Sequence, residues 1–378
     1  MTNATRFLIC TDLYPDTDTR ERGHQTHAVK DLVESAIQGG MMVVGVLRFN
    51  QVISKEIRLK IGISYVGNVK IIDIPIFGYR TRFLSFLSKL FVRKYLPASQ
   101  YDSVISHMSM SYYRANKILP LNTKRHYLVV HQGDFFQKTL KLSIENNDGV
   151  FARSDSIKRK LLDRFGNIEV KGVVYSGIDD KLIEAGRSRN LFDGRYLCSK
   201  SKVVKLIFCG ALLPLKNVDK IIESLPILHE RGVSASLMIV GDGPDLKKLK
   251  SLVCNLALGD CVFFTGWRRK EEVFDFLKDS CIYIMPSKPE TLGLAYLEAM
   301  AMGCLVIGHV GEGIDGIVVD GFNGYLVGAA DAVDIANKIS RFLSLSDVDK
   351  MHVLKRSFEA VSGCTNTKAG LNYFSSFK

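Results

Sequence analysis

The stretch that decides the fold runs from Ile284 to Val327 and reads IMPSKPETLGLAYLEAMAMGCLVIGHVGEGIDGIVVDGFNGYLV. A short apolar run over 282–285 predicts a buried strand that stops at a proline. Residues 292–302 are rich in Leu, Ala and Met and are followed by a glycine, which predicts a helix. The apolar run 304–308 predicts the next strand. This order of strand, loop, helix and strand is the βαβ unit of a parallel sheet.

The loop between the first strand and the helix predicts a ligand site. The backbone N–H groups of Thr291, Leu292 and Gly293 are expected to point out of the helix N-terminus and attract an anion. Gly293 has no side chain to block close approach. Glu290 lies in this loop, and Glu298 lies seven residues after Thr291, on the same helix face. A nucleotide sugar fits this spacing. The alternative is that Glu290 caps the helix and Glu298 is a solvated helix residue.

The same stretch resembles the signature of retaining glycosyltransferases of the family-4 type. The shared pattern is Pro-Ser, a glutamate, a Thr-hydrophobic-Gly turn, a second glutamate and Ala-Met-Ala-x-Gly. The resemblance implies an α/β fold called GT-B, with two facing Rossmann-like domains, a cleft between them and a C-terminal helix that crosses back to the first domain. It also implies that Glu290 contacts the donor sugar and Glu298 the ribose.

The resemblance covers nearly the whole chain and suggests its domain boundaries. The length of 378 residues is sufficient for two domains of ordinary size. Residues 1–180 are expected to form the domain that faces the acceptor and the membrane, and 181–202 a polar linker with an insertion. Residues 203–360 are expected to form the nucleotide-sugar domain, and 361–378 the crossing helix.

Composition and charge narrow the class of protein. Hydrophobic residues make up 47% of the chain and charged residues 24%, as in soluble globular proteins. No apolar run is as long as a membrane span, and the N-terminus shows no signal pattern. The eight cysteines form no C-x-x-C, which indicates reduced thiols in a cytosolic protein. Residues 1–178 carry a net charge of +11 (26 basic, 15 acidic), and residues 179–378 carry +1 (25 basic, 24 acidic). The first half is therefore expected to bind an anionic surface.

The segment FGYRTRFLSFLSKLFVRKYLP predicts a basic amphipathic helix rich in Phe. One interpretation is a membrane-surface helix attracted to anionic lipid. The other is an ordinary helix whose apolar face packs on the sheet. The basic residues assigned to the membrane surface are Arg80, Arg82, Lys89, Arg93 and Lys94. Nucleic acid is a weak alternative, because no binding motif is present.

Further candidate residues in the first half follow predicted strands. By the resemblance, Gly23 and His24 belong to the loop that approaches the acceptor or the donor phosphates, although a plain loop glycine is the alternative. His131 follows a strand that ends at Val130, where parallel sheets bind ligands, and the resemblance places it near the donor sugar as a catalytic residue. His107 is interpreted preferentially as a buried, hydrogen-bonded histidine.

In the second half the resemblance implies a set of donor-binding residues. Lys216 matches the family's lysine on the donor diphosphate, but Ala211 replaces the arginine expected there. Arg268 and Lys288 are the candidates to supply the missing charge. Trp267 either stacks on the base or packs on the surface. The donor-binding candidates are Glu298, Thr291, Leu292, Gly293, Gly210, Gly241, Trp267 and Arg268, and the catalytic candidates are Glu290, Lys216 and His131.

The resemblance implies a retaining glycosyltransferase, which is expected to need no metal and no cofactor. It is expected to use a nucleotide-diphosphate sugar and a glycan or lipid-linked acceptor in bacterial cell-surface polysaccharide assembly. Its predicted place is the cytoplasm, on the inner face of the cytoplasmic membrane. Two alternatives remain open: a GT-B sugar-nucleotide epimerase and a non-catalytic nucleotide-sugar-binding or scaffold protein.

Overall fold

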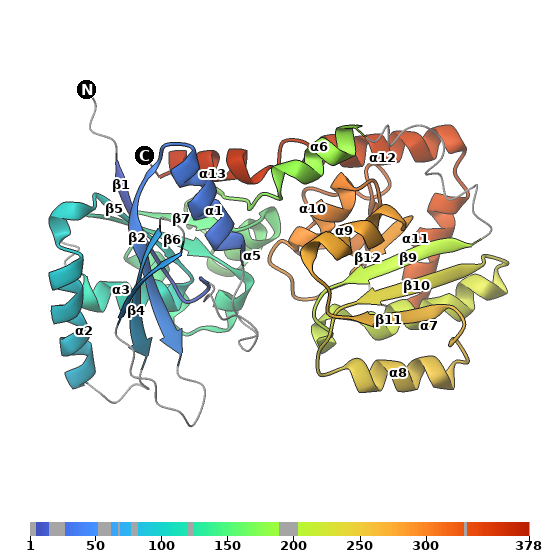
Figure 1. Cartoon of the computed structure of the whole chain (residues 1–378), viewed down its shortest axis with the longest axis horizontal. Helices are drawn as coiled ribbons and strands as arrows, with labels where there is room; N and C mark the ends of the chain where they lie inside the picture. The colour runs from blue at the N-terminus through green and yellow to red at the C-terminus, as the bar shows by residue number, and fades with distance from the viewer. Residues whose placement is uncertain are drawn as a thin grey trace. The chain divides into compact units, whose positions relative to one another are not determined.

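The computed structural model of the chain describes residues 5–14, 27–51, 62–66, 69–76, 82–119, 124–188, 203–328 and 331–377. These residues divide into two compact units. The first contains the described residues up to Gly177 together with those from Asn366 onward, and the second runs from Ile178 to Thr365. Each unit is built on its own sheet (Figure 1).

The first unit has the strand order β3-β4-β2-β1-β5-β6-β7-β8. Neighbouring strands pair in parallel except for β3, which runs antiparallel to β4 at one edge. The sequence did not predict this edge hairpin. The strands are β1 (Arg6–Thr11), β2 (Met42–Gln51), β3 (Gly62–Val66), β4 (Val69–Ile76), β5 (Ser103–His107), β6 (Arg125–Val130), β7 (Gly149–Ala152) and β8 (Val170–Val173). The helices are α1 (His27–Gln38), α2 (Arg82–Tyr95), α3 (Ser109–Ile118), α4 (Thr139–Glu145), α5 (Asp155–Phe165) and α13 (Asn366–Ser375).

The second unit has a parallel sheet in the order β11-β10-β9-β12-β13-β14. The predicted βαβ unit is confirmed, because β12 and β13 flank α10 in sequence and pair in parallel. The strands are β9 (Val204–Cys209), β10 (Ala235–Val240), β11 (Val262–Gly266), β12 (Ile282–Ile284), β13 (Leu305–His309) and β14 (Tyr325–Val327). The helices are α6 (Asp180–Ser188), α7 (Val218–Glu230), α8 (Leu246–Asn255), α9 (Lys270–Lys278), α10 (Leu294–Ala301), α11 (Ala332–Leu343) and α12 (Asp347–Val361).

Part of the predicted linker is helical. Leu182 and Ile183 are buried on α6, and Gly186 lies so close to the second unit's core that a Cβ there would meet the Ala301 carbonyl oxygen at 2.4 Å. These contacts make α6 a packed element of the second unit rather than a linker. The remainder of the predicted linker, 189–202, lies outside the described residues.

The last helix, α13, belongs to the core of the first unit and lies along α1 (Figure 1). Phe374 is fully buried, and its ring centroid lies 5.1 Å from that of Phe7 on β1. A Cβ on Gly370 would meet the backbone nitrogen of Ala36 at 2.9 Å, so the absence of a side chain permits the close approach of the two helices. Helix α13 and strand β1 therefore pack in the same hydrophobic core.

Replacing Phe374 with Ala should destabilise the first unit by about 3–5 kcal/mol, because the deletion leaves a cavity beside Phe7. Amide hydrogen exchange would measure this, with faster exchange expected in β1 and unchanged exchange in β9. Phe86→Ala is the control, since this side chain is exposed and its removal should change stability by less than about 0.5 kcal/mol. Unchanged exchange of β1 in Phe374→Ala would contradict the packing role of α13.

Candidate functional site

The turn that connects β12 with α10, residues 286–293, is held in place by the loop after β9. Asn217 Nδ2 donates to the carbonyl oxygen of Pro286 at 2.7 Å. The backbone N–H of Lys288 donates to the carbonyl oxygen of Leu215 at 2.9 Å. Because β9 and β12 are neighbours in the sheet, their following loops meet at its carboxyl edge. The loop after β9 thus fixes the position of the turn.

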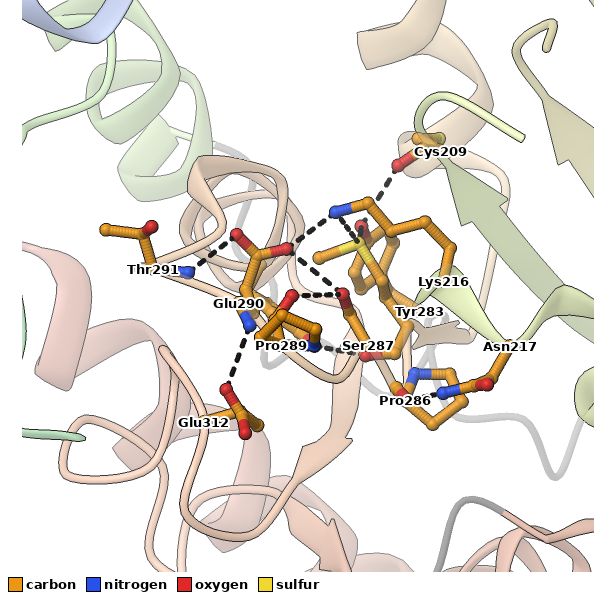
Figure 2. Close-up of polar contacts among 12 residues, drawn as sticks. Cys209, Lys216, Asn217, Tyr283, Pro286, Ser287, Pro289, Glu290, Thr291 and Glu312 are labelled. Carbon is orange, nitrogen blue, oxygen red and sulfur yellow. Dashed lines mark hydrogen bonds and ion pairs between the residues drawn. The ribbon is translucent and has the colours of Figure 1, made fainter. Parts of the chain in front are cut away.

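Glu290 and Lys216 form an ion pair on this turn, with 2.6 Å between Nζ and Oε2. The same carboxylate oxygen accepts from Ser287 Oγ at 3.3 Å, and Oε1 accepts from the backbone N–H of Thr291 at 3.0 Å (Figure 2). The side chains of Lys216 and Glu290 are only 16% and 13% exposed. The structure therefore brings together two of the predicted catalytic residues, with both carboxylate oxygens hydrogen-bonded.

Glu312 is a site residue that the sequence reasoning missed. Its Oε2 accepts from the backbone N–H of Glu290 at 2.9 Å, and its side chain is buried (Figure 2). The next residue, Gly313, lies so close to the turn that a Cβ would be 2.5 Å from the backbone nitrogen of Leu292. The loop after β13 thus supports the turn from the side opposite to the loop after β9. The sequence signal was a glutamate between two glycines, four residues after the end of a predicted strand.

The helix start differs from the prediction. Gly293 adopts a left-handed φ of 75° and caps α10, which begins at Leu294 rather than at Leu292. A Cβ at Gly293 would meet the ring of Tyr296 at 2.6 Å, so glycine is required for this bend. Thr291 therefore lies outside the helix, and the prediction that it shares a helix face with Glu298 is wrong. The prediction of a free N–H at Thr291 is also wrong, because Glu290 accepts it.

Glu298 lies on α10 as predicted, and its carboxylate forms an ion pair with a lysine. Lys270 Nζ, at the start of α9, lies 3.2 Å from Glu298 Oε1. The Glu298 side chain is largely buried, and the lysine is about half exposed. The second carboxylate of the predicted pair is thus held by its own cation, as the first is held by Lys216.

The remaining donor-binding candidates lie at the carboxyl ends of β9, β10 and β11. Gly241 has a φ of 141°, and a Cβ there would lie 1.9 Å from the Gly210 carbonyl oxygen, so no larger residue fits. Trp267 and Arg268 follow β11, and both are exposed, with 72% of Trp267 accessible. Ala211 is also exposed. These positions share the sheet edge that carries the Glu290 turn.

His131 belongs to the first unit, where it is buried directly after β6. Its Nε2 lies 3.0 Å from Nδ1 of His107, which confirms His107 as a buried, hydrogen-bonded residue. Burial lowers the pKa of both rings well below the usual value for histidine, and the nearby Arg153 charge lowers it further. Gly23, His24 and Arg80 lie outside the described residues.

In the described part of the chain, no group of three His, Cys, Asp or Glu side chains is placed to hold a metal ion. None of the described helices has the length and apolar character to cross a membrane. On α2 the described basic side chains are Lys89, which is half-buried, and Arg93 and Lys94, which are exposed in the last turn. Arg82 begins this helix, and its side chain is not among those described.

The geometry of the second unit agrees with a comparison to known families. Residues 198–357 match the family model described as glycosyl transferases group 1. These residues form a glycosyl transferases group 1 domain. The match contains the loop after β9, the Glu290 turn and Glu312, so the family assignment and the candidate site concern the same part of the chain.

Individual relatives and solved structures extend the comparison. An uncharacterized glycosyltransferase of Methanocaldococcus jannaschii is 30% identical over 221 residues, which are 58% of this chain and 55% of the relative. N-acetyl-alpha-D-glucosaminyl L-malate synthase of Bacillus anthracis is 29% identical over 204 residues, 54% and 52% of the two chains. The chain thus spans about half the length of the curated relatives it matches. The structure of Anabaena Alr3699/HepE in complex with UDP has a TM-score of 0.72 at 16% identity and covers 99% of both chains. The predicted GT-B fold class is confirmed.

Glu312→Ala should release the Glu290 turn, because the backbone N–H of Glu290 loses its buried acceptor at a cost of about 1–3 kcal/mol. Hydrogen exchange at the Glu290 amide should accelerate accordingly. Glu312→Gln is the matched control, since its amide oxygen can still accept this bond. Equal protection of the Glu290 amide in Glu312→Ala and the wild type would contradict the supporting role of Glu312.

Proposed function

We propose that the protein is a retaining glycosyltransferase that moves a sugar from a nucleotide-diphosphate donor to a hydroxyl of a glycan or lipid-linked acceptor. The observation that carries the proposal is the Lys216–Glu290 ion pair, held on a preformed turn inside the group 1 domain. A cation beside a carboxylate suits a donor in which an anionic diphosphate adjoins a neutral, hydroxyl-rich sugar. The UDP bound in the Anabaena structure of the same fold supports a nucleotide donor.

The donor is proposed to follow the carboxyl edge of the second sheet. Lys216 would neutralise the diphosphate, and Glu290 would accept hydrogen bonds from sugar hydroxyls. Glu298 would accept hydrogen bonds from the ribose hydroxyls. These bonds would replace its ion pair with Lys270. Gly210 and Gly241 leave room for the close approach of phosphates, and exposed Trp267 offers a face on which the base can stack.

In the reaction, the bond between the anomeric carbon and the diphosphate oxygen breaks. The acceptor oxygen forms a new bond to that carbon on the same face, and its proton is transferred to the leaving diphosphate oxygen. Lys216 stabilises the negative charge that develops on the leaving group. Binding and charge stabilisation of this kind need no covalent nucleophile and, in this proposal, no metal and no cofactor.

A second cation near the diphosphate would compensate for Ala211. Lys288 is better placed than Arg268, because its backbone bonds to Leu215, directly before Lys216, and its side chain is exposed. We therefore assign Lys288 to the donor diphosphate. Arg268 is assigned to the sheet edge beside Trp267.

Incubation with a panel of UDP-, GDP-, ADP- and dTDP-sugars tests the proposal. Release of nucleoside diphosphate from one donor, slow without acceptor and faster with it, is the expected result. An epimerase would return a sugar of changed configuration, and a non-catalytic binding protein would bind the donor without releasing the diphosphate. Either outcome would contradict the transferase.

The two glutamates should fail in different ways. Glu298→Ala should weaken nucleotide binding by about 1–3 kcal/mol, because ribose hydroxyls lose a buried acceptor. Glu290→Ala should lower turnover more than nucleotide affinity. Calorimetry and initial rates separate the two effects, and Lys270→Ala controls for loss of the Glu298 ion pair, since it should not weaken binding. Normal turnover in both glutamate variants would disprove the site assignment.

Lys216→Ala should reduce turnover by roughly 10²–10³, the scale of losing one charge-stabilising group. Lys220→Ala, which removes a nearby helix lysine paired with Glu223, should leave the rate unchanged. Activity should also survive a chelator. Loss of activity with chelator and its recovery with Mg²⁺ would show that a metal, rather than Lys216 alone, stabilises the leaving group.

We also propose that the first unit binds the inner face of the cytoplasmic membrane and reaches a lipid-linked acceptor of cell-surface polysaccharide assembly there. On α2, Val92 is buried against the unit, whereas Phe86 and Leu90 are 56% and 47% exposed. Exposed Lys94 lies one further turn along from Leu90, with Arg93 beside it. Exposed apolar side chains flanked by basic ones suit the surface of an anionic bilayer.

Binding to anionic liposomes should therefore decrease steeply with salt, since each basic residue near the surface contributes about 1 kcal/mol and the attraction is screened. Replacing Arg82, Lys89, Arg93 and Lys94 with Gln should release the protein in a sedimentation assay without changing nucleotide binding. Lys247→Gln with Lys250→Gln on α8 is the control and should remain bound. A wild-type protein that does not bind anionic liposomes at low salt would contradict the membrane proposal.

A further inference from the structure

Three buried side chains of the first unit form a hydrogen-bonded chain that begins on the last helix. The hydroxyl of Tyr373 on α13 lies 2.7 Å from Nε2 of His107, at the end of β5. Nδ1 of His107 lies 3.0 Å from Nε2 of His131, which follows β6. All three residues are at least nine-tenths buried. The chain thus connects residues 266 positions apart in the sequence.

Each of the two histidine rings in this hydrogen-bonded chain carries a single N–H. Burial and the charge of Arg153 lower the pKa of both histidines well below the usual value, so both are neutral at neutral pH. A neutral imidazole donates from one nitrogen and accepts at the other. Once the direction of one hydrogen bond is known, the tautomers of both rings follow.

The hydroxyl of Tyr373 sets this direction. Among the described residues its hydrogen-bond partner is His107, and leaving a buried O–H without an acceptor is unfavourable. Tyr373 therefore donates to Nε2 of His107. The His107 proton is then on Nδ1 and is donated to Nε2 of His131, which places the His131 proton on Nδ1. The opposite direction would leave the hydroxyl proton of Tyr373 without an acceptor.

The position of the His131 ring is fixed as well as its tautomer. Asp134 accepts from the backbone N–H of His131 at 2.8 Å through Oδ2 and from that of Ser109 at 2.6 Å through Oδ1. This carboxylate ties the turn after β6 to the start of α3.

We propose that Tyr373 is a positioning residue which, through His107, fixes His131 as a hydrogen-bond donor at Nδ1. The inference rests on the proposed function, in which the first unit reaches the acceptor. His131 then donates to an acceptor oxygen and does not remove the acceptor proton, because its accepting nitrogen is already engaged by His107. The C-terminal helix thereby contributes to the chemistry of the first unit as well as to its packing.

The test is ¹⁵N spectroscopy of the full chain, labelled at histidine and without ligand. Long-range ¹⁵N–¹H correlations distinguish the two tautomers, and spectra of His107→Gln and His131→Gln assign the signals. Both rings should show the proton on Nδ1 in the wild type, and Tyr373→Phe should abolish this uniform pattern. Tyr112→Phe is the matched control: it loses a buried bond to the Asn146 carbonyl oxygen and should leave both tautomers unchanged. A wild type with the proton on Nε2 of either ring, or an unchanged pattern in Tyr373→Phe, would overturn the proposal.

Activity provides a second readout. Tyr373→Phe should lower turnover roughly tenfold while the donor KM stays within about twofold, the scale of one neutral hydrogen bond. Tyr112→Phe should retain the wild-type rate. Changed tautomers with unchanged turnover would overturn the link between Tyr373 and catalysis. A protein inactive with every donor would instead contradict the proposed function, and the ligand-free spectrum would still decide the tautomer.

Discussion

The ion pair between Lys216 and Glu290 is the interaction on which the candidate site depends. Removing a carboxylate and an ammonium from water is costly unless further hydrogen bonds satisfy them, and here Ser287 and the N–H of Thr291 donate to the carboxylate. Such bonds require a fixed turn. The strand order β9-β12-β13 provides it, because the loops after these adjacent strands meet at one edge and hold the turn from both sides.

Both carboxylates of the motif are paired with lysines, Glu290 with Lys216 and Glu298 with Lys270. A diphosphate would compete with Glu290 for Lys216, and ribose hydroxyls would compete with Lys270 for Glu298. The proposed donor thus replaces existing contacts rather than filling vacant ones, and the free energy of binding is the difference between the two sets.

The fold class and the Glu290 turn were predictable, because periodic apolar runs and a dense local motif determine them. Glu312 was not, since its contact with Glu290 crosses from one strand to the next and has no fixed sequence spacing. The start of α10 was also misplaced: Leu and Ala favour helix, but Gly293 in a left-handed conformation overrides that preference. The role of Tyr373 depends on where α13 packs, which no local pattern encodes.

The most direct test of the central claim is hydrogen exchange of residues 210–217 and 286–293 with and without UDP, GDP, ADP and dTDP. The account predicts that one nucleoside diphosphate slows exchange in both segments, in a saturable manner, and leaves α2 unchanged. If none of the four changes exchange in either segment at millimolar concentration, the loop after β9 and the Glu290 turn do not form a nucleotide-sugar site.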